Sequence, residues 1–154
     1  MMTEPSVNTP NGKPAYWDKA ISQLMRRDRI MRRVIPAHPE VWLQSRGNPF
    51  VTLARSIVGQ QISVKAAESV WQRVLLRCGR RLTPTGVMKT GLTSLRECGL
   101  SQRKAEYVLD LAGHFKTRVV QPQRWTDMDD EAVIKELSAI RGIGRWTAEM
   151  FLIF

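Results

Sequence analysis

The chain has 154 residues, of which 43% are hydrophobic and 25% are charged. This length predicts one domain rather than two complete ones, and the hydrophobic share is enough for a core, which excludes a globally disordered chain. No apolar run approaches the roughly 20 residues that a membrane-spanning helix needs, so we expect no transmembrane segment.

The chain is strongly basic, with 24 Lys and Arg against 14 Asp and Glu and a formal net charge of +10. Most of these cations are arginines, whose planar guanidinium groups suit phosphate oxygens. Nucleic acid is therefore the favoured partner, with a membrane surface and an acidic protein as alternatives. Two cysteines cannot form a four-thiolate zinc or iron–sulfur site by themselves, so we expect Cys78 and Cys98 to be free, partly buried thiols.

The first third of the chain predicts a leader followed by helix. Residues 1–13 are polar and without periodicity, which predicts a disordered leader that lacks the pattern of a secretory signal. Apolar residues then recur at three- and four-residue spacing over residues 14–35, with Asp28 interrupting the stripe. This pattern predicts two helices or one kinked helix, ended by Pro36 and Pro39.

The remainder of the chain shows helical periodicity punctuated by residues typical of helix starts. The predicted starts lie at Asn48, Ser63, Thr83, Thr93, Ser101 and Asp129 or Asp130. Gly59 and Gly79 are expected to end the first two of these helices, residues 117–125 are expected to form a loop, and a last helical run covers residues 146–154. No strand pattern or internal repeat is present, so the prediction is an all-α fold with at least seven helices.

The sharpest local feature is a pair of glycines between two helical stretches. Gly142 and Gly144 bracket Ile143, and a helical run restarts immediately afterwards. Such glycines permit a tight turn and leave the backbone amides of the next helix open to an anion, which in this basic chain would be a nucleic-acid phosphate contacted without reading sequence. The alternative is an ordinary helix–helix connection. A dinucleotide-binding loop is disfavoured, because no strand precedes the glycines.

Three blocks carry a resemblance to a known family. Gly142-Ile-Gly-Arg-Trp-Thr-Ala148 resembles the helix-hairpin-helix of the DNA glycosylase superfamily, in the branch called 3-methyladenine DNA glycosylase II. The other blocks that resemble this branch are Pro49-Phe-x-x-Leu53-x-x-Ser56-Ile57-x-x-Gln60-Gln61-Ile62-Ser63 and Gly99-Leu-Ser-x-Arg103-Lys104-Ala105. The resemblance implies a helix-hairpin-helix glycosylase domain over residues 14–154. It further implies a base excision repair hydrolase that flips an alkylated purine such as 3-methyladenine out of DNA and cleaves its N-glycosidic bond.

The resemblance also implies which residues contact DNA. Backbone groups of Gly142, Ile143 and Gly144 would hold a phosphate, together with a monovalent cation, and Gln61 would fill the gap left by the flipped base. The other positions that align with DNA contacts are Gln60, Ser63, Arg103, Lys104, Arg145 and Thr147. The alternative roles are a polar helix end for Gln61 and a solvated helix face for Arg103 and Lys104.

Trp146 and Met150 align with the base pocket. In superfamily members that also cleave the DNA backbone, the position of Trp146 is a lysine that forms a Schiff base. Tryptophan cannot form one, so the resemblance implies a monofunctional glycosylase whose indole attracts a cationic alkylated purine. The alternative is a core tryptophan that packs the hairpin. Met150 replaces an aromatic residue of some relatives, which leaves the range of damaged bases open. The other tryptophans, Trp17, Trp42, Trp71 and Trp125, are expected in the core.

The resemblance implies a catalytic aspartate in a turn beyond Phe154, so no residue of this chain is predicted to be catalytic. The acids at residues 127–131 precede the hairpin and are expected to form a helix start. We therefore expect a C-terminally incomplete chain that is inactive as it stands. Three explanations of this ending remain open: an incomplete gene or sequence, a frameshifted product, or a genuine non-catalytic module that binds damaged or distorted duplex DNA. The coding sequence after Phe154 would distinguish them.

No side-chain metal site, iron–sulfur cluster or further cofactor is predicted, because His38 and His114 lack partners at ligand spacing. The expected partner is double-stranded DNA that contains alkylated bases. The expected protein is a monomer in the cytoplasm, bound to chromosomal DNA and without membrane contact.

Overall fold

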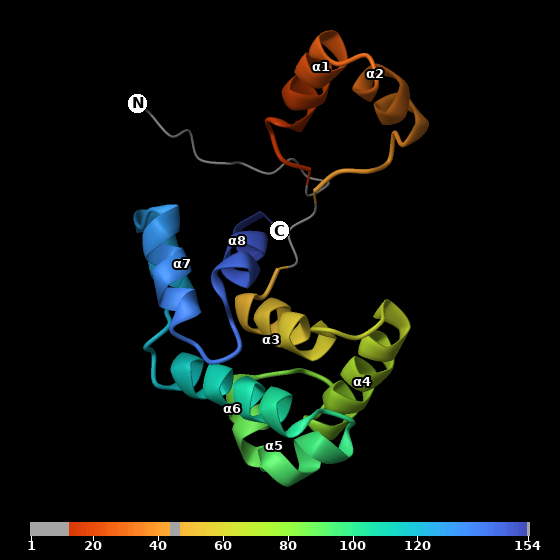
Figure 1. Ribbon diagram of the computed structural model, residues 1–154. Coiled ribbons are helices and arrows are strands. Elements are labelled where there is room, and N and C mark those ends of the chain that lie inside the picture. Colours follow the sequence, from red (N-terminus) through yellow and green to blue (C-terminus); the bar gives the residue numbers. More distant parts are fainter. Residues whose placement is uncertain (1–12, 44–46, 154) are drawn as a thin grey trace. The chain divides into compact units, whose positions relative to one another are not determined.

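The computed structural model describes residues 13–43 and 47–153, and these fall into two units that are treated separately below (Figure 1). Unit 1 holds residues 13–43 and unit 2 holds residues 47–153. The predicted leader, apart from Lys13, lies outside the described residues. Within the described part, every helix is too short or too polar to cross a membrane.

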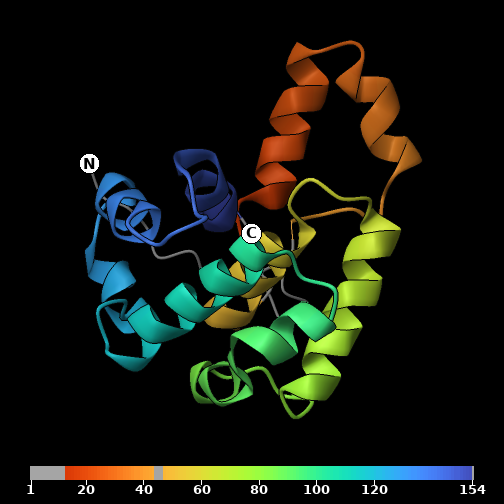
Figure 2. The same ribbon diagram turned by 60° about the horizontal axis from the view of Figure 1, so that its bottom comes forward.

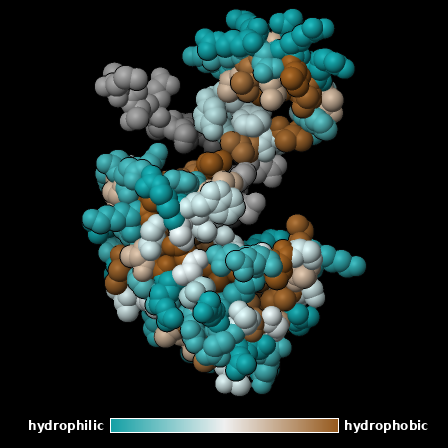
Figure 3. Space-filling model, viewed as in Figure 1, coloured by the Kyte–Doolittle hydropathy of each residue, from teal (hydrophilic) through white to brown (hydrophobic). Residues whose placement is uncertain are grey.

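Unit 1 is a short helical hairpin of α1 (Trp17–Arg27), α2 (Met31–Val34) and the 3₁₀ turn η1 (Ile35–Ala37), which confirms the two predicted helices. Asp28 separates them, because its carboxylate accepts hydrogen bonds from the backbone amides of the turn that follows. The helical stretch continues through Pro36 instead of ending there, since proline is tolerated in the first turn of a helix. In Figure 3 the hydrophobic side chains of this unit gather on one side and the hydrophilic ones on the other.

Unit 2 contains the remaining helices, which confirm the all-α prediction, and no strand occurs among the described residues. They are α3 (Pro49–Gly59), α4 (Val64–Arg77), α5 (Pro84–Glu97), α6 (Gln102–Lys116), the 3₁₀ helix η2 (Pro122–Asp127), α7 (Asp130–Ser138) and α8 (Arg145–Ile153).

Two local predictions in unit 2 need correction. The predicted loop over residues 117–125 contains the start of η2, which Pro122 opens. The two short helices predicted from Thr83 and Thr93 are two halves of α5, separated by Gly91 with φ +73°. The second half therefore starts at a glycine break before Thr93, because a left-handed residue interrupts the helix there.

The predicted helix starts of α3, α4, α6 and α7, and of the first half of α5, are confirmed by side-chain caps. An oxygen of the cap residue accepts a hydrogen bond from a backbone N–H of the first turn in each case. The cap residues are Asn48, Ser63, Thr83, Ser101 and Asp129.

The core of unit 2 is built around α6, which packs on α5 and on α3, while α7 packs on α8 (Figure 2). Its largest fully buried side chains include Leu53, Ile57, Leu95, Leu111, Leu137 and Ile140. Burying one such side chain contributes about 1.5–3 kcal/mol, so these contacts fix the relative position of the helices that carry the site.

Most of the predicted core tryptophans are only partly buried. Trp71 is 4% exposed, as predicted, and Trp125 packs against the core while its indole N–H donates to Glu136. Trp17 and Trp42 are half-buried within unit 1. The cysteines behave as predicted, because Cys98 is buried, Cys78 is half-buried and both are free thiols. Burial raises the pKa of Cys98, which keeps that thiol protonated.

Candidate nucleic-acid interface

The turn between α7 and α8 is held in place by one apolar side chain and one glycine. Ile143 is only 3% exposed and anchors the turn in the core. Gly142 has φ +87°, and a Cβ at this position would overlap the ring of Tyr107 on α6. Gly142 is therefore required by the geometry of the turn itself, so its presence alone is no evidence for a ligand.

Gly144 differs from Gly142 because nothing lies within 4 Å of a Cβ built there and its φ is not in the left-handed region. It occupies the cap position of α8, since its carbonyl accepts from the amide of Ala148 at 3.0 Å. Helices α3 to α7 each begin with a capping side chain, whereas glycine offers none. The start of α8 is thus left open.

The open start of α8 exposes unpaired backbone donors. Among the described residues, the N–H groups of Gly144, Arg145, Trp146 and Thr147 find no acceptor. The N–H of Ile143 is used within the turn, where it donates to the carbonyl of Ile140 at 3.1 Å. By the same criterion the N–H of Gly142 also finds no acceptor, so the amides available to an anion are those of Gly142 and of Gly144 to Thr147, while Ile143, at the centre of the predicted phosphate site, contributes none.

The arginines of the hairpin are engaged with carboxylates. Arg145 pairs with Glu131 at 3.0 Å and with Glu149 at 2.7 Å. The hydrogen bond from Arg145 lowers the pKa of Glu131, and the two carboxylates raise the pKa of Arg145 further above its ordinary value. Exposed pairs of this kind are weak, so a phosphate can compete for the guanidinium. A DNA contact by Arg145 stays a prediction.

Three side chains of α6, spaced three residues apart, contact the backbone at the end of α3 and in the turn before α8. Lys104 donates to the carbonyls of Val58 at 2.9 Å and Gln60 at 2.6 Å. Tyr107 packs on the hairpin, and the Asp110 carboxylate accepts from the N–H of Arg141 at 2.9 Å. The roles of Tyr107 and Asp110 were not predicted, although their spacing from Lys104 is the pattern of one helix face.

Gln60 links two segments that are far apart in the sequence. Its side-chain amide donates to the carbonyl of Gly142 at 2.8 Å, across 82 residues of chain. The predicted blocks around Gln60 and Gly142 are thereby brought together. Two other predicted residues follow Gln60 in the sequence: Gln61 is exposed and has φ +55°, and Ser63 caps α4.

Two further predicted residues have solvent-facing positions. Arg103 is exposed and has no hydrogen-bonding partner among the described residues, which leaves its guanidinium free. Trp146 is 72% exposed, so the alternative of a core tryptophan is wrong. Met150, one turn later on α8, is half-buried. A base pocket formed by Trp146 and Met150 stays a prediction.

Two of the acids that precede the hairpin have structural partners. Asp129 caps α7 by accepting from the amide of Ala132 at 2.7 Å, and Glu131 pairs with Arg145. The predicted helix-start role is confirmed for Asp129.

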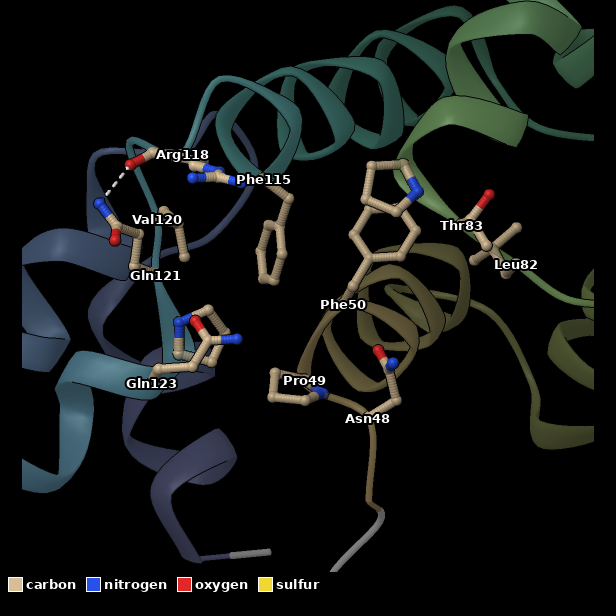
Figure 4. Close-up of a pocket in the computed structure, with 12 residues that line it drawn as sticks. Asn48, Pro49, Phe50, Leu82, Thr83, Phe115, Arg118, Val120, Gln121 and Gln123 are labelled. Atoms are coloured by element: carbon tan, nitrogen blue, oxygen red, sulfur yellow. Dashed lines mark hydrogen bonds between the residues drawn. The ribbon is translucent and has the colours of Figure 1, made fainter.

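A hollow next to α3 and α6 lies away from the hairpin. A cavity of about 590 Å³ is lined by the first residues of α3 and α5 and by the segment that follows α6 (Figure 4). Phe50 and Phe115 form its apolar wall, with their ring centroids 5.3 Å apart. None of the predicted site residues lines it. This cavity is therefore not the predicted base pocket.

A metal centre built from side chains has no support in the described part of the chain, which holds no group of three His, Cys, Asp or Glu residues able to bind an ion. The resemblance implied a monovalent cation on the hairpin backbone. Hard carbonyl oxygens suit such an ion, but Gln60 engages the carbonyl of Gly142, and Ile143 engages that of Ile140. Each of these carbonyls keeps a second lone pair. The cation stays a prediction.

Comparison with known proteins places this geometry among DNA repair proteins. The family described as the HhH-GPD superfamily of base excision DNA repair proteins matches residues 54–150. DNA-3-methyladenine glycosylase 1 of Schizosaccharomyces pombe is 31% identical over 109 residues, which cover 69% of this chain and 48% of that protein. The chain thus spans about half the length of this curated relative.

Solved structures that are similar to this chain include a bacterial glycosidase and a yeast glycosylase. DNA-3-methyladenine glycosidase from Bacillus halodurans has a TM-score of 0.74 and 31% identity, covering 99% of this chain and 67% of that one. The S. pombe 3-methyladenine DNA glycosylase in complex with abasic DNA has a TM-score of 0.79 and 27% identity, covering 88% and 69%.

Proposed function

Because the chain belongs to the HhH-GPD superfamily of base excision DNA repair proteins, and within it to the 3-methyladenine glycosylase family, we propose that it is the DNA-recognition part of a monofunctional alkylbase DNA glycosylase. Its partner is double-stranded DNA that contains alkylated bases such as 3-methyladenine. The relative solved with abasic DNA supports a DNA partner.

The observation that carries the proposal is the uncapped start of α8. Unpaired N–H groups from Gly144 to Thr147 sit at the positive end of a helix, next to an exposed Trp146. This arrangement binds a phosphate oxygen through backbone donors, independently of base sequence. Arg103 adds a free cation, and the net charge of +10 favours association with the duplex.

Recognition of the damaged base follows from two exposed side chains. Gln61 enters the stack at the position that the flipped nucleotide leaves, and the indole of Trp146 faces the extruded base, whose positive ring it attracts. Tryptophan lacks the amine needed for a Schiff base. The reaction of the whole protein is therefore hydrolysis that releases the base and leaves an abasic site.

Hydrolysis needs a carboxylate that stabilises positive charge on the deoxyribose. Three acids near the hairpin are engaged elsewhere, because Glu131 and Glu149 pair with Arg145 and Asp129 caps α7. We expect this chain to bind damaged duplex without releasing 3-methyladenine from alkylated DNA. Clear release by the chain would contradict this assignment of its carboxylates.

Binding through backbone amides is tested with Gly144→Val, which the open space around Gly144 tolerates. Its side chain covers the amides, and losing a hydrogen bond to a charged group costs about 1.5–3 kcal/mol, which weakens binding at least tenfold. Fluorescence anisotropy with a duplex containing an abasic-site analogue measures this. Gly113→Val is the matched control. Gly113 also has open space for a side chain, but it lies in the last turn of α6 and not at the start of a helix. Equal affinities for both variants would overturn the proposal.

A further inference from the structure

We infer that Lys104 is a positioning residue that fixes the Gln60–Gln61 backbone and, through Gln60, the hairpin, instead of contacting DNA itself. The inference rests on the proposed function, because it takes Gln61 and the hairpin as the groups that meet the duplex. It deepens that function by distinguishing the basic side chains that bind phosphate from Lys104, which holds the DNA-binding segments in place.

The ammonium group of Lys104 is directed into the protein. Two of its three N–H donors are used on the carbonyls of Val58 and Gln60, at 2.9 and 2.6 Å. These carbonyls lie at the C-terminal end of α3, where the helix dipole favours a cation. Burial lowers the pKa of Lys104, as expected for an ammonium that has exchanged water for protein.

The hydrogen bond to Gln60 fixes the conformation of the next residue. A carbonyl held at 2.6 Å sets the plane of the peptide between Gln60 and Gln61. Gln61 then takes φ +55°, a left-handed conformation that is unfavourable for a residue with a side chain. Such a conformation persists only where its surroundings impose it, and Lys104 provides that constraint.

Gln60 carries the constraint from α3 to the hairpin. Its backbone carbonyl accepts from Lys104, while its side-chain amide donates to the carbonyl of Gly142 at 2.8 Å. Gly142 also packs against Tyr107, which lies one turn along α6 from Lys104. One network therefore joins the residue that replaces the flipped base to the turn that presents the phosphate-binding amides.

The neighbouring Arg103 offers a matched comparison. It is exposed and free of partners among the described residues, so it has the properties of a phosphate contact that Lys104 lacks. Lys104→Met and Arg103→Met each remove one positive charge from adjacent positions of the same helix. Any difference between them reports what the ammonium of Lys104 does beyond carrying charge.

The first test measures duplex affinity for both variants of the 154-residue chain across a range of salt concentrations. Loss of one phosphate contact reduces the slope of log K against log salt by about 0.9. We expect this reduction for Arg103→Met. We expect an unchanged slope for Lys104→Met with about tenfold weaker binding, partly restored in Lys104→Arg because a guanidinium can donate to both carbonyls. A slope reduced by about 0.9 in Lys104→Met would overturn the inference.

The second test uses no DNA. ¹⁵N relaxation of the free protein measures backbone order, for which rigid residues have order parameters near about 0.85 and flexible ones below about 0.6. In Lys104→Met the order of residues 60–63 and 142–144 should fall, with no change in Arg103→Met. Gln60→Met removes only the side-chain donor and should loosen residues 142–144 alone. Unchanged order in these segments would overturn the inference.

The two tests separate failure of the inference from failure of the proposed function. If the parent chain does not bind duplex, the proposed function fails and the relaxation data still decide whether Lys104 constrains the two segments. If Lys104→Met does not fold, Gln60→Met and Lys104→Arg keep the network testable. Retained rigidity of residues 142–144 in Gln60→Met would then overturn the link to the hairpin.

Discussion

The two ends of the α3–α6 pair in unit 2 are built in opposite ways. At the hairpin end, Arg145 and Lys104 are engaged by protein groups while the backbone amides from Gly144 to Thr147 are free. At the cavity end, Asn48 caps the start of α3, while the guanidinium of Arg118 has no carboxylate partner in the described part of the chain.

The difference between the two ends shows which groups remain available to bind a phosphate. A cation with an internal partner contributes little to phosphate binding until it is released, whereas a row of unpaired amides at a helix start is ready to accept an anion. The two ends are about 16 Å apart along the 11 residues of α3, which exceeds the screening length of about 8 Å at physiological salt. The net charge alone therefore does not locate the DNA surface.

Gly142→Ala should have the largest effect on stability. The added Cβ would overlap Tyr107 and occupy a left-handed conformation, which together cost about 2–4 kcal/mol. Urea unfolding measures the loss. Gly144→Ala serves as the control, since its Cβ meets nothing within 4 Å, and it should change the free energy of unfolding by less than about 1 kcal/mol. Equal losses of unfolding free energy in the two variants would contradict the claim that only Gly142 is required by the geometry of the turn.

Asn48→Ala should affect stability at the cavity end without affecting DNA. Its side chain accepts from the amide of Val51 at 3.1 Å, and losing such a cap costs about 1 kcal/mol. Urea unfolding should show this loss, and duplex affinity should stay at the parent value. Weaker duplex binding by this variant would place a DNA contact at the wrong end of α3.

Glu131→Gln should make duplex binding several-fold tighter, because it removes an anion beside the hairpin and frees Arg145 from one of its two carboxylate partners, leaving Glu149. The pH dependence has a definite sign. The folded state lowers the pKa of Glu131, so the pair stabilises the fold above the ordinary carboxyl pKa and is lost as pH falls through the lowered value. Anisotropy across the acid range should show affinity rising in the parent as Glu131 protonates, and a flatter profile in Glu131→Gln. The same pH dependence of affinity in the parent chain and in Glu131→Gln would contradict this role of the Glu131–Arg145 pair.

Arg118→Ala should have the smallest effect, with duplex affinity and its salt dependence both unchanged. Arg118 lines the cavity at the far end of α6 and lies beyond the range of screened interaction with a phosphate at Gly144. A salt slope that falls by about 0.9 would show that the cavity end also contacts the duplex.

The sequence could predict what local chemistry decides. The caps of α3 to α7, the tight turn at Gly142 and the family blocks all depend on residues within a few positions of one another. The link between Gln60 and Gly142 could not be predicted, because it joins residues 82 positions apart and depends on how α3 packs. The exposure of Trp146 and the inward direction of Lys104 also follow from tertiary packing, which periodicity does not specify.

The most direct test of the account is an NMR titration of the ¹⁵N-labelled chain with a duplex that carries an abasic-site analogue. The amides of Gly144, Arg145, Trp146 and Thr147 should show the largest shifts, because a phosphate oxygen becomes their acceptor. The amides near Arg118 should stay in place. Unmoved amides at the start of α8, with shifts gathered around the cavity instead, would contradict the central claim.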